Sequence, residues 1–417
     1  MEAGSQLERD LFEELLTIPT VDAHEHLPPE AERLKTPADC LDLFSCYCRG
    51  DLVSAGASGE DFNCWQDKSQ PLAGRWQRFA PFLSAIRTGG YAQAALLVVR
   101  DLLELPDLNG DTYQEASERL QGLHKPGYYD WVLREKCNIV SCIQCWQYGN
   151  GPFPDYFCHL APAKEVVDVF SPADLARLKA GSLTDLVACV EEAVSRWRAD
   201  PAVVGIKSTH AYARPIDFRR TSPEDAAAVL RRILAGETLS LAEGQPLQDY
   251  LIYELVDRAT ACGLPIVIHT GLQAGNRNRI RNADPLLLQE LLENFPTCQF
   301  DLFHAGMPWV REIGVLGKYF PNVYLNLAWS HIINPAQARS ALSEWLDMMP
   351  NTKIFGFGGD YSVVEKVYGH LTIARQNIAA VLADKVTRGA FSRSDASMVA
   401  RRLLLENPDR FYRLGLA

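Results

Sequence analysis

Short apolar segments alternate with amphipathic segments along most of this chain of 417 residues. Their β-branched and apolar composition predicts eight strands, at 18–26, 139–144, 166–170, 203–207, 264–268, 299–303, 323–327 and 354–358. From the third strand onward, each strand is followed by a predicted helix. Near-continuous apolar strands between helices are typical of a parallel sheet covered on both faces. Eight such units predict an α/β protein with the (β/α)8 or TIM-barrel architecture, and an open doubly wound sheet is the alternative.

One long segment, from about 30 to 130, interrupts this alternation. It is rich in leucine, alanine, aromatic and charged residues and contains no convincing strand, whereas 91–104 and 112–122 have helical patterns. A connection between a strand and its helix is normally a few residues long, so this segment is too long to be one. We therefore expect a single domain, 1–417, in which 30–130 is a helical insertion that caps the strand ends.

Other sequence signals exclude several classes of function. There is no Gly-x-Gly-x-x-Gly or Walker-type loop, which argues against a dinucleotide or nucleoside triphosphate site. A formal net charge of −11 argues against a nucleic-acid surface. No basic n-region precedes an apolar run near the N-terminus, and apolar stretches such as 92–99 are too short to cross a bilayer. The eleven cysteines indicate free thiols in a reducing compartment, so we expect a soluble cytoplasmic protein without membrane or nucleic-acid partners.

Metal-binding residue types occur at the ends of the predicted strands. The first strand ends in His24 and His26, and residues two apart on a strand project to the same face. A later strand ends in Lys207, and two others are followed by His269 and His304. Asp360 follows the last one. In a (β/α)8 barrel the C-terminal strand ends form one rim, where active sites lie.

The chemistry of this set favours a divalent transition ion over a structural explanation. Singly, each histidine would more often be a buried, hydrogen-bonded residue, Asp360 could cap a helix, and Lys207 could form an ion pair. Four of the nine histidines fall at the ends of three strands, however, and imidazole with carboxylate suits zinc first, with manganese, iron or nickel open. Asp360 could bind the ion, accept a proton from water, or do both. An ammonium cannot ligate a cation, so Lys207 would act as a neutral amine, as a carbamate or as a contact for an anionic substrate.

This set of residues resembles the amidohydrolase superfamily of metal-dependent barrels. Within it, the chain is similar to the amidohydrolase-2 group, to its nodulin/FluG-type domain and to uronate isomerase-like members. The stretches that carry the finer match are Gly205–Tyr212, Ile268–Gly271, Phe303–Trp309 and Asn407–Tyr412. The resemblance spans nearly the whole chain and weakens between about 30 and 130. Residues 1–417 contain no glutamine synthetase domain, so we do not expect a function that depends on that fusion.

The resemblance implies one of two metal arrangements. In the first, His24, His26 and Asp360 hold one ion, and a carbamylated Lys207 bridges to a second ion held by His269 and His304. In the other, one ion is held by His24, His26, His269 and Asp360, while His304 assists catalysis without binding metal. The sequence leaves both arrangements open.

Residues that follow the strand ends are candidates for substrate binding. Arg277 and Arg279 belong to a basic cluster after His269, where they could clamp a carboxylate. Aromatic residues after four of the strands could form an apolar wall: Tyr212, Trp309, Trp329 and Tyr361.

From these residues we expect a metal-dependent hydrolase that cleaves a C–N or C–O bond, as in an amide or lactone, of a small polar substrate. Whether this substrate carries a carboxylate is left open. An isomerase similar to uronate isomerases and a decarboxylase are alternatives, because such enzymes share the same rim on one fold. A non-catalytic metal-binding scaffold is the alternative to an enzyme. The expected binding partner is the small-molecule substrate. The sequence leaves open whether the protein forms a homo-oligomer.

Overall fold

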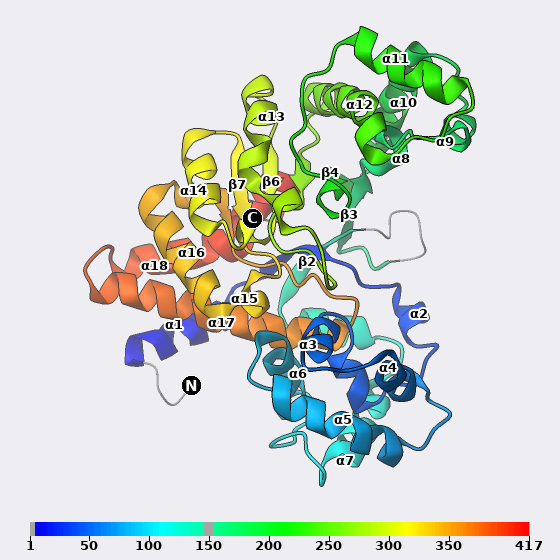
Figure 1. Ribbon diagram of the computed structural model, residues 1–417. Coiled ribbons are helices and arrows are strands. Elements are labelled where there is room, and N and C mark those ends of the chain that lie inside the picture. The colour runs from blue at the N-terminus through cyan, green and yellow to red at the C-terminus, as the bar shows by residue number, and fades with distance from the viewer. Residues whose placement is uncertain (1–4, 146–152, 417) are drawn as a thin grey trace.

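A computed structural model describes residues 5–145 and 153–416 (Figure 1). Its centre is an eight-stranded parallel sheet in which each strand pairs with the next in chain order. The strands are β1 (Thr20–Glu25), β2 (Ile139–Gln144), β3 (Phe157–Pro162), β4 (Val203–Ser208), β5 (Ile266–Ile268), β6 (Phe300–Leu302), β7 (Val323–Asn326) and β8 (Ile354–Phe355). The ring is completed where the Ala23 amide donates to the Phe357 carbonyl oxygen at 3.2 Å and the Asp360 amide donates to that of His24 at 2.7 Å. The predicted (β/α)8 barrel is confirmed.

The third strand lies elsewhere than the sequence pattern predicts. The apolar run at 166–170 begins within a short helix, α8 (Lys164–Val167), and the strand is Phe157–Pro162. A run of a few buried apolar residues does not distinguish a strand from a helical turn. The true strand contains half-buried Cys158 and His159 and ends in a proline, so its pattern is weak.

Helices cover the outside of the barrel (Figure 1). Those outside the insertion are α1 (Gln6–Thr17), α8, α9 (Pro172–Leu178), α10 (Leu183–Ala199), α11 (Pro223–Leu234), α12 (Leu241–Cys262), α13 (Gln289–Asn294), α14 (Val310–Tyr319), α15 (Ser330–Ile333), α16 (Pro335–Met348), α17 (Val364–Thr387), α18 (Arg393–Arg401) and α19 (Asn407–Tyr412). Their ends follow local chemistry: the Ser222 side chain caps α11 ahead of Pro223, and Gly263 ends α12 with φ of 74°.

The segment between β1 and β2 is helical, as its composition predicts. It contains α2 (Glu30–Arg33), α3 (Cys48–Ser54), α4 (Gly59–Gln66), α5 (Leu72–Ile86), α6 (Gly90–Asp101) and α7 (Tyr113–Leu123). Helices α3 to α7 pack around a core of their own, which includes Phe44, Trp65, Trp76 and Phe79. Figure 1 shows α3 to α7 as a blue and cyan group below the barrel.

The first part of α17 joins this insertion to the barrel. Buried Glu365 accepts a hydrogen bond from Arg33 at 2.8 Å and lies 3.6 Å from His124, so residues from both ends of the insertion meet at one carboxylate. One turn further along, Gly369 packs against the Ala94 backbone of α6, where a Cβ atom would collide. The insertion is therefore held against the barrel by close polar and backbone contacts.

Among residues 5–145 and 153–416, no single helix is long and apolar enough to cross a membrane. Helices α5 and α6 reach this length and apolar content only when they are taken together, and the chain bends by 118° between them.

Candidate metal centre

Two histidines at the end of β1 lie side by side. The ring centroids of His24 and His26 are 4.7 Å apart, as expected for strand positions whose side chains project to one face. His24 is buried, whereas a quarter of the His26 side chain is exposed. Burial lowers the pKa of His24 well below its usual range, and the charge of Lys207 adds to this effect. His24 is therefore neutral at physiological pH, which is the state that binds a metal.

Asp360 joins these histidines from the loop after β8. Its Oδ1 atom is 3.5 Å from Nε2 of His24 and 3.1 Å from Nε2 of His26. One ligand atom from each of the three residues lies within 4.8 Å of the other two. Asp360 has φ of 58°, in the left-handed region that non-glycine residues seldom adopt. Such strained residues cluster at functional sites.

Two buried acids on β1 hold the backbone around Asp360. The Gly359 amide donates to Oδ1 of Asp22 at 2.9 Å, and the Tyr361 amide donates to Oε2 of Glu25 at 2.7 Å. A Cβ atom at Gly359 would collide with the Glu25 carboxyl, so this position requires glycine. Burial raises the pKa of Asp22 to about 7 and that of Glu25 well above its usual range. The acids near His24 in the sequence thus position the third candidate ligand.

His269 and His304 form a second pair beside the first. Nδ1 of His304 is 3.0 Å from the Ala328 carbonyl oxygen, and Nε2 of His269 is 3.0 Å from that of Leu272. A carbonyl oxygen only accepts, so each of these nitrogens must carry the hydrogen. The two remaining nitrogens, Nε2 of His304 and Nδ1 of His269, face each other at 3.0 Å. Burial lowers the pKa of both residues well below the usual range, so two lone pairs point at one another.

Facing lone pairs repel unless a cation lies between or beside them. A separation of 3.0 Å is less than twice the Zn–N bond length of about 2.0–2.1 Å, so both nitrogens can reach one ion. Asp360 connects the two pairs, because its Oδ2 atom is 3.6 Å from Nδ1 of His304. The donor set of four imidazoles and a carboxylate fits one or two divalent ions.

Lys207 lies at the end of β4, deep in the barrel. Its Nζ atom is buried, has no hydrogen-bond partner within the described part of the chain, and lies 3.4 Å from the centroid of the Phe303 ring. Burial lowers the pKa of Lys207 to about 8, whereas nearby Cys145 and Asp360 act in the opposite direction. A substantial fraction of neutral amine near pH 8 is what reaction with carbon dioxide requires.

Tyr47, from the insertion, covers this cluster and was not anticipated from the sequence. Its hydroxyl donates to Oδ1 of Asp360 at 2.6 Å. Its ring lies against Trp329 and Tyr361, with centroids 4.3 and 5.5 Å away, and Tyr91 of α6 follows at 5.6 Å. The residue just ahead of α3 has no recognisable motif, so no sequence signal marks it.

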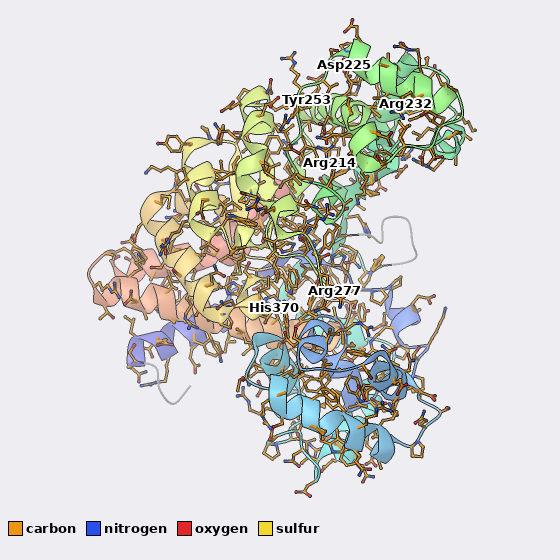
Figure 2. The ribbon with its side chains drawn as sticks, in the orientation of Figure 1. Arg214, Asp225, Arg232, Tyr253, Arg277 and His370 are labelled. Carbon is orange, nitrogen blue, oxygen red and sulfur yellow. The ribbon has the colours of Figure 1, made fainter. Side chains whose placement is uncertain are left out.

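The structure brings some of the predicted substrate residues to the cluster and leaves others outside it. Trp329 and Tyr361 are buried beside Tyr47, and the Tyr212 ring lies 4.7 Å from that of His269. Trp309 is half-buried at the start of α14. Arg277, labelled in Figure 2, and Arg279 are exposed on the loop after β5. This loop meets the insertion where Asn276 donates to the Gly50 carbonyl oxygen at 3.4 Å.

Comparisons with known proteins identify the family to which this chain belongs. The model of the amidohydrolase family matches residues 160–414. A curated relative, protein fluG of Emericella nidulans, is 30% identical over 236 residues, which cover 53% of this chain and 27% of that protein. The chain therefore matches only about a quarter of the length of this relative.

Solved structures share the fold across the whole chain, insertion included. The uronate isomerase of Thermotoga maritima has a TM-score of 0.78 at 15% identity and covers 98% of both chains. The glucuronate isomerase of Caulobacter crescentus has a TM-score of 0.79 at 16% identity, over 99% of this chain and 94% of its own. A protein described as a metal-dependent hydrolase, from Lactobacillus casei, has a TM-score of 0.64 at 18% identity, over 97% and 98%. Identities this low show a common fold alone. The family match over residues 160–414, on a barrel of this kind, places the chain in the amidohydrolase family.

Proposed function

We propose that this chain is a metal-dependent hydrolase that cleaves a C–N or C–O bond, as in an amide or lactone, of a small polar and carboxylated substrate. The observation that carries the proposal is the position of Asp360. Its Oδ1 atom faces His24 and His26, and its Oδ2 atom faces His304, so one carboxylate contacts both histidine pairs. A group placed there can ligate an ion and accept a proton from an attacking water.

His24, His26 and Asp360 would hold the first ion. In the arrangement with two ions, His269, His304 and a carbamylated Lys207 would hold the second. When bound, a divalent ion such as zinc supplies a Lewis acid for the substrate carbonyl and lowers the pKa of a coordinated water. Manganese, iron and nickel are the other candidates for the same ligands.

Tyr47 and the insertion would complete the reaction chamber. The Tyr47 hydroxyl, by donating to Oδ1, directs the second oxygen of Asp360 toward His304. The proton accepted by Asp360 would then be delivered to the leaving nitrogen or oxygen, as general acid catalysis requires. The insertion and barrel would act as one domain, with the insertion as a cap that excludes bulk water.

Substrate recognition would combine charge at the mouth with an aromatic interior. Arg277 and Arg279 would attract a substrate carboxylate, because their exposed guanidinium groups lie on the loop that meets the insertion. Tyr212, Trp309, Trp329 and Tyr361 would form the walls.

A sugar-acid isomerase is the second candidate. It is supported by the match to uronate isomerase structures, which extends over 98% of both chains and so includes the insertion. In that reaction the ion would polarise a carbonyl group, and Asp360 or Tyr47 would move a proton between neighbouring carbons.

A substrate screen separates the candidates. The zinc- and manganese-loaded protein should be incubated with N-acyl amino acids, lactones and uronates, and products identified by nuclear magnetic resonance. We expect hydrolysis of an amide or lactone, lost in Asp360→Asn. Conversion of a uronate to its keto isomer without hydrolysis would replace the proposal by the second candidate. Metal binding without turnover of any compound would favour a scaffold.

A further inference from the structure

A hollow of about 130 Å³ opens within the insertion, between the segment 41–46 and helices α3, α4 and α5. None of the candidate metal ligands lines it. Four aromatic residues line it, Phe44, Phe62, Trp65 and Phe79. The centroid distances between neighbouring rings are 5.0 Å for Phe62 and Trp65 and 5.3 Å for Trp65 and Phe79.

The size of the hollow limits what it can hold. An apolar cavity of about 150 Å³ accommodates benzene, whereas sites for drug-sized ligands measure about 300–1,000 Å³. A space of about 130 Å³ therefore fits a single six-membered ring. Aromatic rings at edge-to-face angles, such as 78° between Phe62 and Trp65, offer a further ring both faces and edges to pack against.

The polar groups around the hollow favour an anion. The Arg49 guanidinium stacks 4.0 Å above the Phe62 ring centroid, which leaves its in-plane N–H groups available, and no carboxylate pairs with it in the described residues. Asp42, the acid that lines the hollow, forms an ion pair with Lys68 at 2.7 Å. Nε1 of Trp65 is buried and has no acceptor within the part of the chain that the structure describes. One buried donor thus lacks an acceptor, and the exposed Arg49 offers further donors at the rim.

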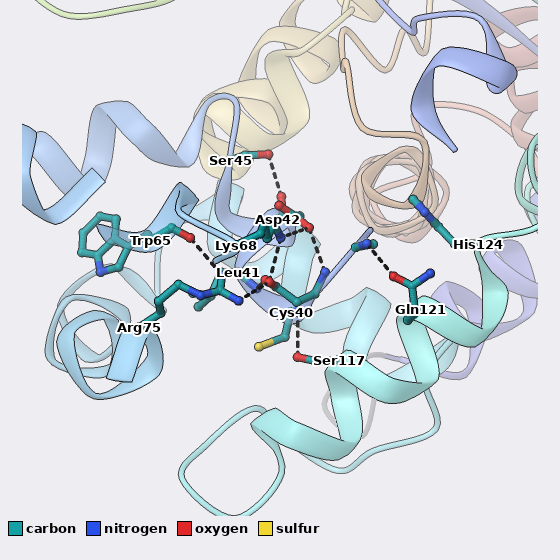
Figure 3. Close-up of polar contacts among 12 residues, drawn as sticks. Cys40, Leu41, Asp42, Ser45, Trp65, Lys68, Arg75, Ser117, Gln121 and His124 are labelled. Atoms are coloured by element: carbon teal, nitrogen blue, oxygen red, sulfur yellow. Dashed lines mark hydrogen bonds and ion pairs between the residues drawn. The ribbon is translucent and has the colours of Figure 1, made fainter. Parts of the chain in front are cut away.

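A network of polar contacts fixes the walls in advance (Figure 3). Lys68 lies 2.7 Å from carboxylate oxygens of both Asp39 and Asp42. Arg75 donates to Asp39 at 2.8 Å and to the Trp65 carbonyl oxygen at 3.0 Å, so one buried guanidinium joins α4 to the 3₁₀ helix Cys40–Phe44 that Asp39 caps. Binding at a pre-formed hollow does not have to order its walls, which favours affinity for a small ligand.

We infer that this hollow is a second ligand site, distinct from the metal centre, for a single-ring aromatic carboxylate. The ring would occupy the space among Phe44, Phe62, Trp65 and Phe79. The carboxylate would accept hydrogen bonds from Arg49 at the rim. The inference stands independently of the reaction proposed for the metal centre, because it uses none of the same residues.

Calorimetric titration of the full-length, metal-loaded protein with phenylacetate tests the inference. We expect saturable binding, weaker by about tenfold for neutral phenylacetamide and in Arg49→Gln, because each change removes one partner of a charge-assisted hydrogen bond. Arg100→Gln is the matched control, since Arg100 is an exposed arginine of the same insertion that pairs with Asp101 instead. It should bind phenylacetate as the unsubstituted protein does.

The metal centre offers the competing explanation, because carboxylates also bind metal ions. Leu52→Trp, which fills the hollow without touching the metal ligands, should abolish binding while metal content and melting temperature stay unchanged. If Leu52→Trp fails to fold, Leu52→Phe provides the same test at smaller volume. Absence of saturable binding, or binding that chelation of the metal removes and Arg49→Gln leaves intact, would overturn the inference.

Discussion

The Tyr47 hydroxyl lies 2.6 Å from Oδ1 of Asp360, although 313 positions separate the two residues in the chain. Tyr47 belongs to the insertion that follows the first strand, whereas Asp360 follows the last strand. Their hydrogen bond joins the insertion to the loop after the last strand, at the candidate metal centre. The insertion is thereby part of the site and contributes a donor that the barrel strands do not supply.

Removal of this donor should impair turnover more than folding. We expect Tyr47→Phe to lower kcat/KM about 10- to 100-fold, because a hydrogen bond to a charged group contributes about 1.5–3 kcal/mol. Steady-state kinetics on the substrate found by screening provides the measurement. Tyr91→Phe is the control, since Tyr91 packs in the same aromatic group but Tyr47 is the residue that contacts Asp360. Equal losses in the two variants would argue for a packing role alone.

Metal content should depend on both pairs of histidines. Mass spectrometric metal analysis of the purified protein should find about one to two divalent ions per chain. The double substitution His24→Ala with His26→Ala should abolish binding at the first position, and His269→Ala should lower occupancy because it removes one of the two facing nitrogens. His159→Gln, a half-buried histidine of β3, serves as control. Full metal content in the double variant would contradict the rim assignment.

Carbon dioxide should promote metal uptake through Lys207. Carbamylation requires the neutral amine, and burial lowers the pKa of Lys207 to about 8. The neutral fraction therefore rises from about one tenth at pH 7 to about nine tenths at pH 9. Metal uptake by the metal-free protein should be enhanced by bicarbonate, and more so at pH 9. In Lys207→Ala the bicarbonate effect should vanish, while uptake that depends on the histidines alone remains. Unchanged metal content together with weaker substrate binding would instead make Lys207 a substrate contact.

The stability of the metal-free protein should depend on pH through the buried carboxyl group of Asp301 on β6. Burial raises the pKa of Asp301 to about 7 despite hydrogen bonds from Tyr412, at 2.5 Å, and Asn326. The folded state thus holds a proton between pH 3.8 and 7 that the unfolded state has released, so this contribution to stability is present at low pH and is lost as the pH rises through 7.

The size of this effect follows from the pKa shift. Between pH 5 and 8, the free energy of unfolding should fall by roughly 2–3 kcal/mol more in the unsubstituted protein than in Asp301→Asn, which cannot titrate. Urea denaturation of chelator-treated samples at both pH values provides the comparison. Parallel pH dependence in the two proteins would show that Asp301 titrates near its ordinary pKa.

The barrel and the residues on its rim can be predicted from local patterns in the sequence. Apolar runs between helices mark the strands, and the C-terminal ends of parallel strands form one rim, which is where His24, His269, His304 and Asp360 lie. The same local reasoning fails at the third strand, because Phe157–Pro162 has a weak pattern and 166–170 has a stronger one.

The sequence alone therefore determined the fold class and the residue types that face one another, since both depend on local periodicity. Tertiary structure decided which atoms of His269 and His304 converge, which acids hold Asp360, and that Tyr47 covers the centre. These relationships join residues that are tens to hundreds of positions apart. The spacing of residues along the chain does not predict these relationships. They depend on how the insertion packs against the barrel and on the hydrogen bonds that orient each side chain.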